Sequence, residues 1–264
     1  MMIDIIVPTH HVPLFRTLKL TLECIEAIYA NTKEPFHLII VDDSMDKLTP
    51  VYFKELQYVH DNITLIHSDR PYKSGNQIFN QGLTKATSDL VAIVVNSVQV
   101  QPDWETVALD LMKEDSEIGA IGFKCLFPWG LIETVGIMVD GLIPKDLGRD
   151  MPGHALTSVC PVEAVSWSFV LLRKEAIGTL NENTYHGFAG WDDIDNCFVM
   201  RKAGWKVVSC GLGAGIHYPR STRLGDNAMS KQKQSEKNAQ IFYKRWGYWK
   251  DVQKARRQAV EAFR

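Results

Sequence analysis

The chain has 264 residues, 45% of them hydrophobic, and its 29 Lys and Arg residues against 31 Asp and Glu residues give a formal net charge of −2. This composition is typical of a globular protein and excludes a disordered chain, a collagen-like repeat and a strongly basic nucleic-acid binder. The longest apolar run in the first half, Leu90 to Val95, is far shorter than the roughly 20 residues that cross a bilayer.

The first residues and the cysteines bear on the cellular compartment. The opening stretch MMIDIIV contains no basic segment, so the sequence predicts no secretory signal. Five cysteines are widely spaced and form no CxxC pair, which favours free thiols in a reducing compartment over a zinc site. We therefore expect a cytoplasmic protein, at the inner face of a membrane if its basic tail binds lipid.

That basic tail is hidden by the near-neutral total charge. Residues 231–264 contain ten Lys and Arg residues and three Asp and Glu residues, a local charge of +7, so the rest of the chain carries −9. Such a tail can contact anionic lipid or an acidic polymer. A solvated helix face is the alternative.

Short β-rich runs alternate with helical patterns over the first 125 residues. Apolar residues recur at helical spacing between residues 14 and 29, and residues 76–86 and 103–114 also predict helices. This alternation predicts an α/β fold with a doubly wound, mostly parallel sheet and flanking helices. The predicted strands are 3–8, 37–43, 63–68, 90–96 and 118–123.

The pattern changes after residue 125. Residues 126–165 are rich in Gly and Pro, which predicts hairpins and long loops. The glycine-rich segment 211–215 opens no helix, so we interpret it as a turn. In this half we expect short β-segments at 133–139 and 162–167, helices at 174–180 and 191–203, and a strand at 206–210.

Several nucleotide and hydrolase motifs are missing. No GxGxxG follows the first predicted strand, which argues against a dinucleotide-binding Rossmann domain. The chain also lacks a Walker A loop, an HExxH helix and a GxSxG elbow. These absences remove most nucleotide hydrolases, zinc proteases and serine hydrolases from consideration.

Polar residues follow the predicted strands, where ligands bind in doubly wound sheets. Asp42 and Asp43 end the second strand, and their carboxylates could accept hydrogen bonds from a ribose or a base. Asp also favours turns and helix caps, so a structural role is the alternative. The other strand-end candidates are Thr9, the segment 69–73 and Asn96.

An acidic cluster opens the helix predicted at 191–203. Asp192, Asp193 and Asp195 are more carboxylates than one helix cap needs. Like charges raise one another's pKa, which suits a general base near neutral pH. A solvated acidic helix start is the alternative. Further on, His217 follows the last predicted strand and is either a metal ligand or a partner of the backbone.

Read in chain order, these segments resemble the family 2 inverting glycosyltransferases, in particular their rhamnosyltransferase-like bacterial branch. The resemblance covers residues 3–250 and implies a nucleotide-sugar-binding, glycosyltransferase A-type (GT-A) fold. The segments that carry it are IIVPT at 5–9, IIVDDS at 39–44, NQGL at 80–83, VQPDW at 100–104, VSWSFVLLR at 165–173, GWDDID at 190–195, RKAGWKV at 201–207, His217, and KN with FYKRWG between 237 and 247.

The resemblance also implies a domain organisation and a reaction. One domain would span 1–225, with a nucleotide-sugar-binding half at 1–125 and an acceptor and catalytic half at 126–225. A basic helical tail would follow at 226–264. The expected reaction moves a sugar from a nucleoside-diphosphate donor, such as a UDP or dTDP sugar, to a glycan or lipid-linked acceptor.

Site residues follow from the same resemblance. Asp193 matches the catalytic base, with Asp192 at the preceding acidic position, and His217 matches a metal ligand. The nucleoside would be held by Pro8, Thr9, Asp42 and Asp43, with Asp69 and Asn96 completing the nucleotide site. Trp167 and Trp191 would flank the acceptor.

One departure concerns the metal. The family has a metal-binding Asp after the fourth strand, whereas this chain reads Asn96-Ser-Val98 there. Asn96 could still offer an amide oxygen, so Mg²⁺ or Mn²⁺ would be held weakly with His217. Alternatively, cationic side chains would neutralise the diphosphate; the candidates are Arg70, Lys73, Arg220 and Arg223.

The same departure leaves a second class of function open. A domain that lost catalysis could keep sugar-nucleotide or glycan binding. A nucleotidyltransferase is a third interpretation, although Thr9-His-His-Val12 lacks the glycine-rich and basic loop that such enzymes use.

Overall fold

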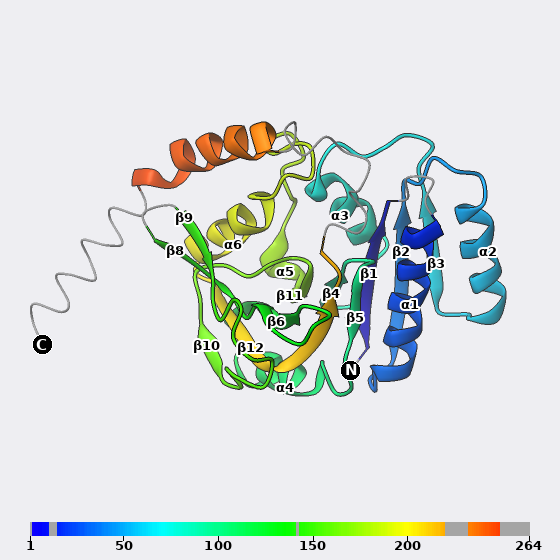
Figure 1. Cartoon of the computed structure of the whole chain (residues 1–264), viewed down its shortest axis with the longest axis horizontal. Coiled ribbons are helices and arrows are strands. Elements are labelled where there is room, and N and C mark those ends of the chain that lie inside the picture. Colours follow the sequence, from blue (N-terminus) through cyan, green and yellow to red (C-terminus); the bar gives the residue numbers. More distant parts are fainter. Residues whose placement is uncertain (1, 11–14, 141–142, 220–231, 249–264) are drawn as a thin grey trace, which may run out of the picture.

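The computed structural model describes residues 2–10, 15–140, 143–219 and 232–248 (Figure 1). In the first half, β1 (Ile3–Thr9) pairs in parallel with β2 (Phe36–Asp42) and, on its other side, with β4 (Leu90–Val94), while β2 pairs with β3 (Ile63–His67). These strands are the Ile- and Val-rich runs that the sequence predicts. Such runs are continuous because both faces of the sheet are covered.

The sheet continues beyond β4 with strands of mixed direction. β11 (Phe169–Arg173) runs antiparallel between β4 and β6 (Ile118–Leu126), and β12 (Lys206–His217) pairs in parallel with β6. The order is β10-β12-β6-β11-β4-β1-β2-β3, with β5 on β12 and β7 on β6. The shorter strands are β5 (Val98–Val100), β7 (Ile132–Thr134), β8 (Ile137–Asp140), β9 (Ile143–Asp146) and β10 (Val159–Pro161).

Helices cover both faces of this sheet (Figure 1). On one face, α1 (Phe15–Asn31), α2 (Thr49–Val59) and α4 (Thr106–Glu114) pack on a core that includes Ile5 and Val7. On the other face, α3 (Gly75–Leu83), α5 (Lys174–Ile177), α6 (Asp192–Lys202) and a helix at 232–248, here called the C-terminal helix, pack on a core that includes Ile6. The α/β prediction with a mostly parallel sheet is confirmed.

The C-terminal helix lies beside α6 (Figure 1). Phe242 and Trp246 are buried and make edge-on contacts with Phe198 of α6, with ring centroids 5.1 and 5.5 Å apart. This part of the basic tail therefore belongs to the core. The boundary expected at 225 and the rest of the tail lie outside the described residues.

Two local predictions are wrong, and one helix was not predicted. α2 was not predicted, because it buries only Thr49 and Phe53 fully and leaves Val51, Tyr52, Tyr58 and Val59 exposed, so its sequence shows little helical periodicity. Residues 162–167 form no strand; their apolar side chains are buried under the sheet instead, where Val165 packs on Gly122. Residues 211–215 continue β12 through an irregular register, and their glycines are needed because a Cβ at Gly211 would lie 1.8 Å from the carbonyl oxygen of Leu156.

Candidate active site

A cavity of about 420 Å³ lies beyond the carboxyl ends of β1 and β4. Of the predicted site residues, seven line it: Pro8, Thr9, Asn96, Trp167, Asp192, Asp193 and His217. Segments that are distant in sequence therefore meet where a doubly wound sheet is expected to bind its ligand. The sequence did not single out Glu133 and Phe188, which also line it.

Asp193 is the most perturbed acid in this cavity. It lies in the first turn of α6 and is half-buried. Burial, and then the neighbouring Asp192 carboxylate, raise the pKa of Asp193 to about 7, although backbone N–H groups of Ile194 and Trp167 partly oppose the shift. A carboxylate with this pKa can accept a proton near neutral pH.

Asp192 lies against the start of a second helix. A Cβ on Gly75, the first residue of α3, would be 2.3 Å from Asp192 Oδ2, so only glycine leaves room for this carboxylate. Helix N-termini favour negative charge. Asp192 and Asp193 are therefore placed by the beginnings of two helices.

Asp195, the third acid of the cluster, has a different environment. It is buried and accepts hydrogen bonds from Tyr185 Oη at 3.0 Å and Trp246 Nε1 at 2.5 Å, and Arg245 contacts its other oxygen at 2.9 Å. Burial raises the pKa of Asp195, while these partners lower it. Asp195 thus joins α6 to the C-terminal helix and does not line the cavity.

Asp42 and Asp43 are buried behind the cavity. Asp42 accepts hydrogen bonds from Thr9 Oγ1 at 2.8 Å and His67 Nδ1 at 2.8 Å, as well as from the Ser44 hydroxyl. Asp43 accepts from the Tyr72 backbone N–H at 2.7 Å and contacts His10 Nδ1 at 2.7 Å. Both carboxylates are engaged by protein groups, and through Thr9 and His10 they fix two residues that do line the cavity.

The charged residues predicted at positions 69, 70 and 73 do not line the cavity. The Asp69 side chain is fully exposed and lies 3.7 Å from His67 Nε2. Arg70 and Lys73 are exposed and do not line the cavity, whose basic side chains, among the lining residues described, are His10 and His217. Arg220 and Arg223 lie outside the described residues.

The residues predicted to hold a metal come together only in part. His217 pairs with Val98 across β12 and β5, which brings it close to Asn96. Asn96 Nδ2 donates to Thr21 Oγ1 at 2.9 Å, so the amide oxygen is the atom left for a ligand. His217 Nδ1 lies 2.5 Å from Glu133 Oε2, which leaves Nε2 as its remaining ring nitrogen.

This donor set does not fit a divalent cation held by the protein alone. Mg²⁺ and Mn²⁺ prefer several oxygen ligands, carboxylates above all. In the part of the chain that the structure describes, no three His, Cys, Asp or Glu residues are grouped to hold a metal. Asn96 and His217 offer two neutral ligands, and the nearby Glu133 is already paired with the imidazole.

The two tryptophans differ in position. Trp167 is buried, lines the cavity and packs on Phe79 with ring centroids 5.6 Å apart. Trp191 instead contacts the C-terminal helix: its Nε1 donates to Ser235 Oγ at 3.2 Å, and its ring lies 5.3 Å from that of Phe242. Only Trp167 is placed to contact a ligand in the cavity.

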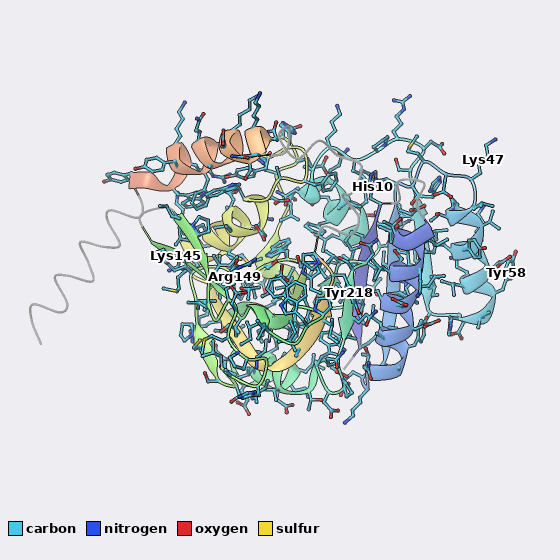
Figure 2. All side chains as sticks on the ribbon, in the orientation of Figure 1. His10, Lys47, Tyr58, Lys145, Arg149 and Tyr218 are labelled. Atoms are coloured by element: carbon cyan, nitrogen blue, oxygen red, sulfur yellow. The ribbon has the colours of Figure 1, made fainter. Side chains whose placement is uncertain are left out.

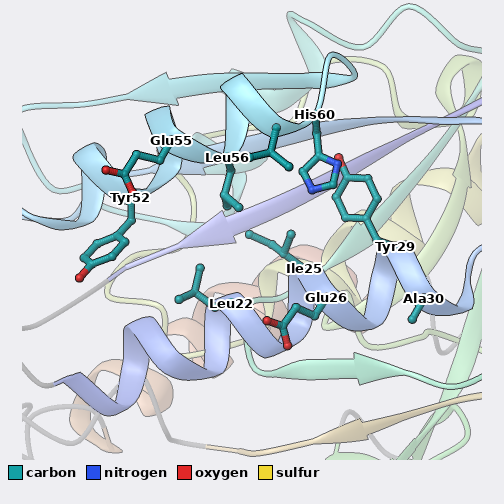
Figure 3. Close-up of a pocket in the computed structure, with 10 residues that line it drawn as sticks. Leu22, Ile25, Glu26, Tyr29, Ala30, Tyr52, Glu55, Leu56 and His60 are labelled. Carbon is teal, nitrogen blue, oxygen red and sulfur yellow. The ribbon is translucent and has the colours of Figure 1, made fainter.

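A second cavity, of about 660 Å³, lies between α1 and α2 (Figure 3). Its lining is largely apolar, with Leu22, Ile25 and Leu56 between Tyr29 and Tyr52. It lies on the opposite face of the sheet from α6 and contains none of the predicted site residues. The cavity beyond β1 and β4 is therefore the candidate active site.

No helix among the described residues is long and apolar enough to cross a membrane.

Fold and site together define an α/β domain with an acidic pair facing a strand-end cavity. Residues 4–130 match the family model described as glycosyl transferase family 2. This match covers just under half of the chain and supports the resemblance in its sequence. The chain's assignment to a rhamnosyltransferase-like branch stays a prediction.

One curated relative is the O-antigen biosynthesis protein RfbC of Myxococcus xanthus, 25% identical over 236 residues. The match covers 85% of this chain but only 18% of that protein.

Three solved structures share the fold, at 12–16% sequence identity. GalNAc-T7 with UDP, GalNAc and Mn²⁺ has a TM-score of 0.67 over 92% of this chain and 50% of its own. The mannosyltransferase PcManGT of Pyrobaculum calidifontis, with GDP-Man and Mn²⁺, has a TM-score of 0.56 over 83% and 58%. TarS of S. aureus, residues 1–349, has a TM-score of 0.56 over 92% and 72%. The GT-A fold is therefore confirmed.

Proposed function

We propose that this protein is an inverting glycosyltransferase that moves a sugar from a nucleoside-diphosphate donor to a glycan or lipid-linked acceptor. The observation that carries the proposal is the half-buried Asp193, whose pKa of about 7 places a proton acceptor in a strand-end cavity. The match of residues 4–130 to the glycosyl transferase family 2 model supports it. The naming of one relative for O-antigen biosynthesis favours a polysaccharide or lipid-linked acceptor.

The proposed step is a single displacement. Asp193 takes the proton of the acceptor hydroxyl while the oxygen of that hydroxyl attacks the anomeric carbon of the donor sugar. The bond from that carbon to the diphosphate breaks in the same step. The nucleoside diphosphate departs from the opposite face, so the configuration at the anomeric carbon inverts. Asp192 would keep the pKa of Asp193 high enough for proton transfer at neutral pH.

Donor binding is assigned to the side of the cavity formed by β1. Thr9 and Pro8 would contact the nucleoside, and Asp42 would act through its hydrogen bond to Thr9. Asp43 would act in the same way through His10. This revises the direct contacts that the resemblance implies for both acids, because their oxygens already have protein partners.

We assign no step to a metal ion. Asn96 and His217 offer too few ligands for one, so we expect Mg²⁺ or Mn²⁺ to add little to donor binding. The missing carboxylate also makes a non-catalytic sugar-nucleotide-binding module the second candidate function.

A panel of sugar nucleotides separates the two candidates. Thermal-shift assays would detect binding, and release of nucleoside diphosphate would detect transfer or hydrolysis. The proposal expects both for at least one donor, with release strongly reduced by Asp193→Asn. Binding without release for every donor would favour the binding module. If no donor showed binding or release, both candidate functions would be rejected.

We further propose that the C-terminal helix faces a membrane that carries the acceptor. Its outer face exposes Lys233, Lys237 and Lys244, with Tyr243 and Tyr248 beside them. Figure 2 shows that the side chains on the outer side of this helix project away from the body of the protein. Lysines attract anionic lipid and tyrosines suit the interface.

A further inference from the structure

The loop at residues 186–191, which leads directly into the catalytic helix α6, has an unusual backbone. Gly187, Phe188, Gly190 and Trp191 all have positive φ angles, of 75°, 48°, 79° and 83°. For a residue with a side chain this conformation costs roughly 1–2 kcal/mol. Such a loop keeps its shape only if its surroundings hold it.

The shape of this loop matters for the site. Phe188 and Gly190 line the cavity, and Asp192 and Asp193 follow immediately. Any shift of the loop would therefore move both the wall of the cavity and the start of α6.

One buried side chain of the C-terminal helix bonds to both ends of the loop. Asn238 Nδ2 donates to the carbonyl oxygen of His186 and to that of Gly190, each at 3.2 Å. Its Oδ1 accepts from Gln234 Nε2 at 3.0 Å, which orients the amide. Both amide hydrogens of Asn238 are thus used to fix carbonyls four residues apart.

Further contacts hold the loop from two sides. Ser235 accepts from the Trp191 indole, and a Cβ on Gly187 would lie 3.0 Å from Gln234 Cγ, so the helix lies directly against the backbone there. On the other side, the Gly187 N–H donates to the carbonyl oxygen of Lys73 at 2.9 Å. The loop is therefore held between the C-terminal helix and the segment before α3.

We propose that Asn238 is a positioning residue, which fixes the loop at 186–191 and through it the placement of Asp193 against the acceptor. The inference rests on the proposed function for its catalytic readout. Its structural readout, the order of the loop, does not depend on that function. A displacement of about 1 Å at a reacting group can cost roughly 100-fold in rate.

Two substitutions at Asn238 separate donation from space filling. Asn238→Asp keeps the shape but replaces the NH2 group, and with it both donated hydrogens, by one oxygen that faces the two carbonyls. Asn238→Ala removes the whole group. Asn62→Ala is the matched control, because Asn62 also donates to a backbone carbonyl, that of Phe36 at 2.9 Å, but at the far end of β2.

We expect both Asn238 variants to lower kcat about 10- to 100-fold. Their donor Kd should stay within about threefold, since one pocket wall moves and the β1 side does not. Hydrogen–deuterium exchange of the amides at 186–191 should speed up by about tenfold, the effect of losing about 1.4 kcal/mol of local protection. Asn62→Ala should lower the unfolding temperature and leave kcat and this exchange unchanged.

Normal kcat and normal exchange in Asn238→Asp would overturn the proposal, as would an equal loss of kcat in Asn62→Ala. If the wild-type protein turned over no donor, the proposed function would fail by itself. The exchange measurement would then decide whether Asn238 holds the loop, and unchanged exchange would overturn that too.

Discussion

Replacing Asp193 by Asn removes the proposed proton acceptor and keeps the size and polarity of the side chain. Loss of a general base costs about 10²- to 10⁴-fold in rate. We expect this loss in kcat, with donor Kd little changed, because the nucleoside side of the cavity is formed by β1. The assay is release of nucleoside diphosphate under saturating donor and acceptor.

The pH profile gives an independent check of the same residue. The base must be ionised to act, and the pKa of Asp193 is about 7. The wild-type rate should therefore rise with pH and level off above about pH 8; at pH 6 only about a tenth of Asp193 would be ionised. The residual activity of Asp193→Asn should lack this acidic limb.

The same shift predicts a stability change with a defined sign. The folded state raises the pKa of Asp193 from its ordinary value of 3.8, so ionisation at higher pH destabilises the fold. The stabilising effect of Asp193→Asn should thus be absent below pH 4 and fully present above pH 7. Because Asp193 is only half-buried, we expect about 1–2 kcal/mol, a rise of a few degrees in Tm at pH 8.

Three results would refute this reasoning: near-normal kcat in Asp193→Asn, an acidic limb that persists in the variant, or a Tm that falls at pH 8. The first two would remove Asp193 as the base. The third would mean that the ionised carboxylate of Asp193 stabilises the fold, contrary to the destabilisation that its raised pKa implies.

Three further predictions concern the rest of the site and the surface. Glu133→Gln should weaken UDP or dTDP binding about 3- to 10-fold, the effect of one hydrogen bond of roughly 1 kcal/mol, because the His217 side chain in the cavity loses the carboxylate that orients it; unchanged affinity by calorimetry would contradict this. Exchanging Mn²⁺ for a chelator should change that affinity less than tenfold, or about 1.4 kcal/mol, and a larger effect would show that the missing Asp has been replaced. Reversing the charge of Lys233, Lys237 and Lys244 should abolish sedimentation with anionic vesicles, since each lysine contributes about 1 kcal/mol to membrane binding. Binding that persists would show that this face of the helix is not the membrane contact.

The parts of the fold that the sequence predicts depend on local patterns. The parallel strands β1 to β4 are apolar runs, and α6 begins at an acidic cluster next to Gly190, whose positive φ suits glycine. The strand ends then follow from the fold class, so Thr9 and Asn96 could be placed at one edge of the sheet before the structure was known.

What escaped prediction depends on partners distant in the chain. The sequence predicts that Asp42 binds a ligand, but His67 and Thr9 already hydrogen-bond to its carboxylate. Glu133 carries no motif, and only the pairing of β12 with β5 and β6 brings it against His217.

Asn238 is the clearest example of such a residue. It lies 45 residues beyond Asp193, in a basic segment that carries part of the family resemblance but gives no sign of what this side chain contacts. No local pattern indicates that its amide bonds to the loop before α6, because that contact exists only once the C-terminal helix has packed.

The most direct test of the account is a crystal structure of Asp193→Asn with an intact sugar nucleotide bound. The account predicts the nucleotide in the cavity beyond β1 and β4, with the nucleoside against Thr9 and the anomeric carbon within reach of residue 193. A nucleotide bound between α1 and α2, or one whose sugar points away from residue 193, would contradict it.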